Sequence, residues 1–180
     1  AVSGVLQSKS GGATLLDVGA GSGAVLRHLT SRYSFDSLVG LDNHPQSAKR
    51  ISTEKANSAI DAVQGDAFTL PFADNAFDIV ICSLFLHHLT DSQIVQTLAE
   101  MRRVAKQAVI GIDLKRSPWA YWSYRAFCAS FRISELVTHD GSLSIMKSFS
   151  RDELLEFGKA AGLESPRVES VFPFRWVLIG

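Results

Sequence analysis

The sequence predicts an α/β protein with a doubly wound, mostly parallel sheet, and three features of the chain carry this prediction. An apolar run at 14–18 breaks into alternating glycines and resumes with helical spacing at 24–29, which indicates a strand, a tight turn and a helix. Short apolar segments then alternate with helix-like segments as far as Leu114, as they do in parallel sheets with helices on both faces. The length of 180 residues, without a repeat or linker, predicts one domain over 1–180.

Composition and charge exclude several classes of function. Hydrophobic residues make up 46% of the chain and charged residues 20%, as in an ordinary globular domain. Eighteen basic residues balance eighteen acidic ones, and no basic run exceeds two residues, so we expect no nucleic-acid partner. We find no apolar stretch of membrane-spanning length and no signal peptide, so we expect no stable membrane insertion and a cytoplasmic location. Cys82 and Cys128 are predicted to be buried free thiols.

The first strand ends in a turn suited to a nucleotide-type ligand. Gly19, Gly21 and Gly23 lie between the strand and the helix, where glycine allows positive φ and a close approach of the backbone to a ligand. The pattern Gly19-x-Gly21-x-x-Ala24 also satisfies the dinucleotide fingerprint. However, Asp17, two residues before the first glycine, would repel a pyrophosphate at close range. It would favour a cofactor that carries a cationic amino group and a sulfonium.

Acidic residues also close the next two strands. The strand predicted over 37–42 ends in Asp42, which could accept hydrogen bonds from both hydroxyls of a ribose or could cap the helix predicted over 46–56. The strand predicted over 62–67 leads to Asp66, with Phe68 beside it. This loop suits an adenine, because it offers a carboxylate for the exocyclic amine, a backbone N–H for a ring nitrogen and an aromatic wall.

Four motifs in this order resemble those of class I S-adenosylmethionine-dependent methyltransferases. Leu-Asp-Val-Gly-Ala-Gly-Ser-Gly at 16–23 is similar to motif I, and the acid at the end of the second strand is also a feature of that family. Gly-Asp-Ala at 65–67, Leu-Pro-Phe at 70–72 and Phe-Asp-Ile-Val at 77–80 resemble the third and fourth motifs. The resemblance extends along almost the whole chain, and it implies S-adenosylmethionine as cofactor and a Rossmann-like sheet of seven strands. The implied cofactor contacts are Asp17, Gly19, Ala20, Gly21 and Gly23 at the methionine end, Asp42 and Asn43 at the ribose, Asp66, Ala67 and Phe68 at the adenine, and Ser83 and Leu84 near the sulfonium.

Two adjacent histidines, His87 and His88, follow the strand predicted over 79–82. The sequence Leu-His-His-Leu at 86–89 resembles the form found in small-molecule and quinone-type methyltransferases, and differs from the form that acts on amino groups of nucleobases. Because imidazole titrates near neutral pH, either histidine could take a proton from a hydroxyl group of the substrate. The alternative is that one or both only shape the start of the next helix.

The chain next departs from the minimal pattern through an insertion at 116–149, which follows a helix predicted over 92–103 and a strand predicted over 108–114. The first part of the insertion, 118–131, carries aromatic residues around most of a helical circumference. That helix is expected either to pack on the sheet or to form a lid over the substrate. The sequence His-Asp-Gly at 139–141 predicts a turn, and without a second cluster of ligands we expect no metal.

The end of the chain predicts one more helix and two strands. The helix is expected over 150–161, with Ser150 as its N-cap and Glu153 three residues further on. The strands over 167–171 and 174–180 resemble the terminal hairpin that places an antiparallel last strand in the sheet of this methyltransferase family.

The sequence therefore favours methyl transfer from S-adenosylmethionine to a small apolar or aromatic molecule, at a hydroxyl oxygen. One alternative is a protein that binds the cofactor without transferase activity, because a fold and a cofactor site do not establish chemistry. A less favoured alternative is an NAD-dependent oxidoreductase. It would have to place a pyrophosphate near Asp17, and the sequence has no evident Tyr-Lys pair for hydride transfer.

Overall fold

The computed structural model describes residues 12–53 and 60–180. The last residues of the helix expected over 46–56, from 54 on, therefore lie outside the described residues. The elements follow in the order β1 (Ala13–Val18), α2 (Ala24–Thr30), β2 (Phe35–Asp42), α3 (Pro45–Thr53), β3 (Ile60–Gln64), β4 (Phe77–Ser83), the 3-10 helix η1 (Leu86–His88), α4 (Asp91–Val104), β5 (Ala105–Leu114), α5 (Pro118–Ser130), α6 (Glu135–Met146), α7 (Arg151–Ala160), β6 (Arg167–Val171) and β7 (Arg175–Ile179).

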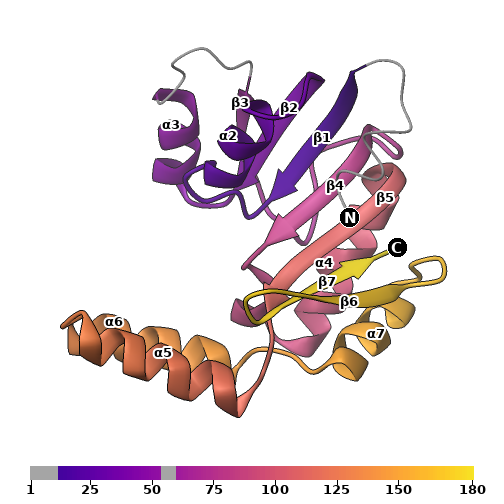
Figure 1. The fold of residues 1–180 in the computed structure, drawn as a ribbon. Coiled ribbons are helices and arrows are strands. Elements are labelled where there is room, and N and C mark those ends of the chain that lie inside the picture. Colours follow the sequence, from indigo (N-terminus) through magenta and orange to yellow (C-terminus); the bar gives the residue numbers. More distant parts are fainter. Residues whose placement is uncertain (1–11, 54–59) are drawn as a thin grey trace.

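The seven strands form one sheet in the order β3-β2-β1-β4-β5-β7-β6 (Figure 1). Strands β1 to β5 pair in parallel, and β7 runs antiparallel to both of its neighbours, β5 and β6. This confirms the predicted doubly wound, seven-stranded sheet with an antiparallel last strand. The strand order reverses between β1 and β4, and doubly wound folds bind ligands at the carboxyl ends of the strands beside such a reversal.

Helices cover both faces of the sheet, and the alternation of strand side chains divides the interior into two cores (Figure 1). Leu16 belongs to one core together with Leu98 of α4, whereas its neighbour Leu15 belongs to the other core with Leu26 of α2 and Ile51 of α3. Burial on both faces explains why the strands read as continuous apolar runs in the sequence. The two free cysteines are buried, as predicted.

The helix after the insertion begins as the sequence predicts. The Ser150 Oγ accepts a hydrogen bond from the Glu153 N–H at 3.3 Å, and Glu153 Oε2 accepts one from the Ser150 N–H at 2.7 Å. This reciprocal capping box satisfies two of the backbone donors that a helix start leaves open. The terminal hairpin of β6 and β7 is also confirmed.

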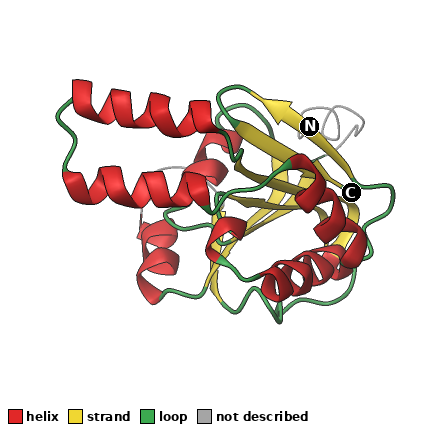
Figure 2. Ribbon diagram, turned by 90° about the horizontal axis from the view of Figure 1, so that it is seen from below, coloured by secondary structure: helices red, strands yellow, loops and turns green. Residues whose placement is uncertain are grey.

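The insertion forms two helices, α5 and α6, that pack against each other and extend beyond the sheet as an arm (Figures 1 and 2). The expected helix over 118–131 is present. It packs against α6 and not on the sheet, and only Ala120 and Cys128 of this helix are buried, while most of its other residues are exposed.

The turn predicted at 139–141 is wrong, since these residues lie inside α6. Ser134 caps this helix by accepting a hydrogen bond from the Val137 N–H at 3.5 Å. Gly141 is needed for packing: a Cβ at this position would collide with the phenol of Tyr124, whose hydroxyl donates a hydrogen bond to the Val137 carbonyl at 2.9 Å. The Asp-Gly pair therefore marks a close contact between two helices and not a change of chain direction.

Candidate active site

The glycine turn after β1 adopts the backbone conformation that the sequence requires of it. Gly19, Gly21 and Gly23 have φ angles of 72°, 54° and 77°, a region that favours glycine. The N–H groups of Gly19 and Ala20 both donate to the Leu41 carbonyl, at 2.8 and 3.0 Å, which ties the turn to β2. A Cβ at Gly21 would meet nothing within 4 Å, so this part of the turn faces open space.

Asp17, at the end of β1, is buried with an unsatisfied oxygen. Its side chain is 1% exposed, and its Oδ1 has no hydrogen-bond partner in the described part of the chain. Burial, and second the negative charge of Asp42, raise the pKa of Asp17 from 3.8 to about 7. A buried carboxylate oxygen without a donor is costly. A cationic or N–H group of a ligand near this oxygen would therefore stabilise the site.

Asp42, at the end of β2, joins the glycine turn to the start of α3. Its Oδ2 accepts a hydrogen bond from the Gly21 N–H at 2.9 Å, and its Oδ1 accepts one from the His44 N–H, also at 2.9 Å. Each carboxylate oxygen has a further lone pair, so Asp42 can also accept from a ribose. The two roles that the sequence left open for Asp42, ribose binding and support of the next helix, are thus compatible.

Six of the predicted cofactor residues meet in one pocket of about 90 Å³. This is well below the roughly 300 Å³ of a whole-ligand site, so the pocket would hold one part of a cofactor. Its lining comprises the predicted Gly19, Asp42, Asn43, Asp66, Ala67 and Phe68, together with Leu41, Gly65, Phe85 and Leu89. The other predicted cofactor residues, Asp17, Ala20, Gly21, Gly23, Ser83 and Leu84, lie outside it, on the glycine turn and at the ends of β1 and β4.

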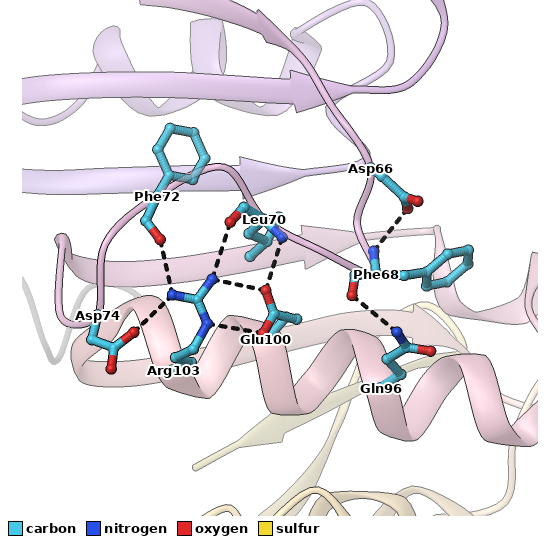
Figure 3. Close-up of polar contacts among 8 residues, drawn as sticks. All are labelled: Asp66, Phe68, Leu70, Phe72, Asp74, Gln96, Glu100 and Arg103. Atoms are coloured by element: carbon cyan, nitrogen blue, oxygen red, sulfur yellow. Dashed lines mark hydrogen bonds and ion pairs between the residues drawn. The ribbon is translucent and has the colours of Figure 1, made fainter.

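The loop that carries Asp66 and Phe68 is held in place from α4 (Figure 3). Asp66 Oδ1 accepts a hydrogen bond from the Phe68 N–H at 2.9 Å, and the Phe68 carbonyl accepts one from Gln96 Nε2 at 3.0 Å. Further along the loop, Arg103 donates to the Leu70 and Phe72 carbonyls at 3.0 and 2.9 Å and pairs with Asp74 and Glu100, both at 2.8 Å (Figure 3). The loop at 66–74 is thus held in place by side chains of α4 that lie behind it.

Leu84, directly after β4, is in a strained conformation at the edge of the site. Its φ of 53° is unusual for a residue with a Cβ. The Leu84 N–H donates to the Ile112 carbonyl at 2.8 Å, so β5 holds this strained residue in place. The backbone at 83–84 is therefore rigid where the sequence predicts contact with the reacting end of the cofactor.

His87 forms a buried pair with Asp113, a residue at the end of β5 for which the sequence suggested no role. His87 Nδ1 lies 2.7 Å from Asp113 Oδ1, and the His87 N–H donates to Asp113 Oδ2 at 3.3 Å. A carboxylate at Nδ1 favours the tautomer with the proton on Nδ1, which leaves Nε2 as an acceptor. In the structure, Nε2 makes no hydrogen bond within 12–53 and 60–180.

His88 is in a different environment, exposed and next to His87. The ring centroids of the two histidines lie 4.0 Å apart. Partial burial, and next the positive charge that His87 can carry, lower the pKa of His88, with Lys147 adding to the effect and Asp113 opposing it. His88 is therefore mostly neutral at pH 7, but no carboxylate in the described part of the chain orients it as Asp113 orients His87.

Comparison with known proteins identifies the family. A family model described as "Methyltransferase domain" matches residues 16–114, from the middle of β1 to the end of β5. The chain belongs to this methyltransferase family. An uncharacterized methyltransferase of Synechocystis sp. is 34% identical over 116 residues, which cover 63% of this chain and 53% of the relative. The ubiquinone/menaquinone biosynthesis C-methyltransferase UbiE of Enterobacter sp. is 29% identical over 172 residues, 86% of this chain and 67% of the relative.

The chain spans about half the length of the first of these relatives. Among solved structures, a SAM-dependent methyltransferase from Aquifex aeolicus superposes with a TM-score of 0.68 at 20% identity, covering 93% of this chain and 80% of that one. These findings confirm the expected class I methyltransferase fold and its cofactor, S-adenosylmethionine.

The residues present in this methyltransferase domain fit that cofactor. A cationic group would stabilise the orphaned oxygen of Asp17, and S-adenosylmethionine carries an amino group and a sulfonium; the open face of Gly21 leaves room for a ligand.

Sequence reasoning missed two contributors, and the sequence holds a signal for each. Phe85 lies against the glycine turn so closely that a Cβ at Gly19 would come within 2.6 Å of its ring. It stands in the segment already singled out for its histidines. Asp113 interrupts the apolar run of the fifth strand near its carboxyl end, as Asp17 does in the first strand.

Proposed function

We propose that this domain transfers a methyl group from S-adenosylmethionine to a small apolar or aromatic molecule, at a hydroxyl oxygen. The observation that carries the proposal is Asp17, a buried carboxylate with an unpaired oxygen at the glycine turn. When bound, S-adenosylmethionine supplies a methyl group activated by a sulfonium. The chain itself must bind the cofactor, align the acceptor, exclude water and remove a proton.

The proposed cofactor contacts divide along the carboxyl ends of the strands. Asp17 and the turn from Gly19 to Gly23 would hold the methionine end, and Asp42 the ribose. The pocket at Asp66 would take the adenine against the ring of Phe68, with the rigid backbone at 83–84 closest to the sulfonium. Asn43 would add a contact to the ribose side, since it lines the same pocket.

His87 is our candidate for the group that takes a proton from the acceptor. Asp113 holds its Nδ1 at 2.7 Å, which orients the ring and leaves Nε2 free to accept. The proton of the acceptor hydroxyl would move to Nε2, and the imidazolium that forms would be stabilised by the buried Asp113 carboxylate. His88, mostly neutral near pH 7, is the alternative base. Substituting each histidine separately distinguishes the two candidates.

An apolar pocket at the carboxyl end of β5 supports the proposed class of acceptor. Its volume is about 430 Å³, within the range of sites for small organic ligands. Its walls come from the arm, the end of β5 and the turn between β6 and β7, and include Ala120, Phe127, Ile145 and Phe174. We propose that the insertion at 116–149 thus acts as one wall of the acceptor site, the lid role expected from its sequence.

A ring carbon of a quinol is the second candidate for the methylated atom. It is favoured by the relative from Enterobacter sp., whose name describes a C-methyltransferase of ubiquinone and menaquinone biosynthesis. Removing the phenolic proton at His87 would serve either outcome, since a phenolate is nucleophilic at oxygen and at the adjacent ring carbons. The position of the new methyl group, read by NMR on the product, distinguishes the two.

Calorimetric titration tests cofactor binding first. We expect S-adenosylmethionine and S-adenosylhomocysteine to bind, NAD not to bind, and Asp42→Ala to lose binding. The matched control is Asp36→Ala, an exposed aspartate on the same strand but at its other end. Binding of NAD alone would refute the proposal, and binding of the two sulfur nucleotides without turnover on any phenol or quinol would favour the non-catalytic alternative.

Kinetics of histidine variants test the base. Transfer of labelled methyl groups to a panel of phenols and quinols should fall about 10²-fold or more in His87→Asn and in Asp113→Asn. Cofactor affinity should remain unchanged, and the exposed His28→Asn should retain full activity. A loss of activity confined to His88→Asn would assign the role of base to that residue. Full activity in His87→Asn, His88→Asn and Asp113→Asn would exclude a histidine base.

A further inference from the structure

The apolar pocket proposed above for the acceptor contains a half-buried arginine, Arg175. Most of the pocket's walls come from the arm, whose helices, like every helix in the described residues, are too short or too polar to cross a membrane. Apart from Lys115, Arg175 is the only charged residue among the described residues of the lining, and none of them is acidic. A cation in the wall of an apolar pocket is unfavourable without a negative group beside it. A negatively charged group of a ligand would therefore stabilise this pocket.

The fold brings Arg175 to the end of β5. Leu114 pairs with Arg175 across β5 and β7, and the Lys115 N–H donates to the Phe174 carbonyl at 3.0 Å. The turn between β6 and β7 therefore lies beside the end of β5, where the chain enters the arm (Figure 1). Leu114 lines the pocket, and its N–H donates to Asp113 Oδ1 at 2.7 Å. The pocket thus begins one residue after the carboxylate that orients the candidate base.

Two backbone carbonyls hold the guanidinium of Arg175 and leave one of its edges free. Nη1 donates to the Pro173 and Phe174 carbonyls at 3.2 and 3.3 Å. Nε and Nη2 make no hydrogen bond or ion pair with any residue that the structure describes. These two nitrogens form the side of the guanidinium that can donate two parallel hydrogen bonds to one carboxylate. The guanidinium is therefore held in place while half of its donors remain available to a ligand.

Most other polar side chains of the pocket already have partners. The hydroxyls of Ser123 and Tyr124 donate to backbone carbonyls at 3.2 and 2.9 Å. The ammonium of Lys115 lies 4.5 Å from the centroid of the Trp176 ring, in a cation–π contact. The available donors of the pocket thus lie mainly on Arg175.

The two acidic residues that adjoin the lining in sequence do not neutralise Arg175. Asp113, before Leu114, is paired with His87 at 2.7 Å. Asp140, on α6, is 72% exposed, and the histidine before it lies 3.9 Å away. No ion pair in the described part of the chain includes Arg175. Its positive charge is therefore available to a bound anion.

We propose that the methyl acceptor carries a carboxylate and that Arg175 binds it. The inference rests on the acceptor site proposed above and narrows its ligand from an apolar or aromatic molecule to an aromatic acid. The aromatic body would pack against apolar walls that include Ala120, Phe127 and Ile145. Nε and Nη2 of Arg175 would donate to the two carboxylate oxygens. This contact would orient the ligand in a pocket whose other walls offer few directional interactions.

Calorimetric titration with a matched pair of ligands tests the inference. The pair is a hydroxynaphthoate and its neutral carboxamide, which share one ring system and differ in charge. We expect the wild-type protein, with S-adenosylhomocysteine present, to bind the acid about tenfold or more tightly than the amide, and the difference to shrink as salt rises. Arg175→Gln should remove this preference without changing the affinity for the amide, and Arg175→Lys should restore part of it. Arg167→Gln, which replaces an exposed arginine on β6, is the matched control and should behave as the wild type.

Equal affinity of the wild-type protein for acid and amide would overturn the inference. A preference for the acid that persists in Arg175→Gln, shown to be folded by circular dichroism, would also overturn it. Transfer of labelled methyl groups separates this failure from that of the proposed function. Equal transfer to acid and amide would refute the carboxylate site and support the methyltransferase activity, whereas preferred binding of the acid without any transfer would support the carboxylate site and refute that activity.

Discussion

Replacing Asp17 by asparagine should make the free energy of unfolding depend less on pH. The pKa of Asp17 is raised from 3.8 to about 7, chiefly by burial. Well below pH 4 this carboxyl is protonated in both the folded and the unfolded protein and contributes nothing to a pH dependence. Between pH 4 and 7 the Asp17 carboxyl is ionised mainly in the unfolded protein, so the free energy of unfolding falls as pH rises. Above pH 7 this loss of stability levels off.

The raised pKa sets the size of this effect. Three pKa units correspond to about 4 kcal/mol in total, of which about 2 kcal/mol falls between pH 5 and 7. An asparagine side chain carries no charge at any of these pH values, so Asp17→Asn should remove this part of the pH dependence. At pH 8 the variant should exceed the wild type by about 1 to 3 kcal/mol, because the buried amide keeps an unsatisfied group of its own.

Urea unfolding of the cofactor-free protein at pH 5, 6, 7 and 8 measures this difference, with the exposed Asp36→Asn as the control. The same variant should lose affinity for S-adenosylmethionine, so greater stability would accompany weaker binding. Parallel pH profiles for the wild type and Asp17→Asn would refute the argument that burial holds this carboxyl protonated. Unchanged cofactor affinity would refute the role proposed for Asp17 at the methionine end.

Three further predictions concern other groups of the chain. Arg103→Met should lower stability by about 2 kcal/mol, a fall in Tm of about 4 to 8 °C, because it removes the hydrogen bonds that hold the loop at 66–74; Arg102→Met, next to it and exposed, should have little effect. Gly141→Ala should loosen the arm without unfolding the sheet, seen as faster hydrogen exchange in α5 and α6 only; unchanged exchange there would show that the contact with Tyr124 is dispensable. Burial and nearby carboxylates raise the pKa of Cys82, so thiol reagents should modify it only on unfolding, and rapid labelling of the native protein would contradict this.

Most of the fold could be predicted from the sequence because local patterns and tertiary structure agree. Strands buried on both faces read as continuous apolar runs, glycines mark the turn that needs positive φ, and Ser150 with Glu153 forms the capping box. The predictions failed where a residue has a long-range partner. Gly141 reads as a turn former, and its contact with Tyr124 across the arm is invisible in a local window.

The candidate site was predicted less completely, for a similar reason. The acids near the ends of the first three strands, Asp17, Asp42 and Asp66, can be recognised from the local sequence. Asp42 and Asp66 do line one pocket. The pairing of His87 with Asp113 depends on the register between β4 and β5, which sequence periodicity alone does not give. The position of the arm could not be predicted either, because an aromatic helix has the same pattern whether it is buried by its own domain or by a partner.

The segment from Gln96 to Asp113 joins two parts of the site that lie on different strands. Its first half, in α4, holds the loop of Asp66 and Phe68, and its second half, β5, ends at the partner of His87. No loop separates the halves, since α4 ends at Val104 and β5 begins at Ala105. A displacement of α4 along the sheet would therefore shift the loop of Asp66 and the carboxylate that orients His87 together, because one uninterrupted stretch of backbone carries the contacts to both.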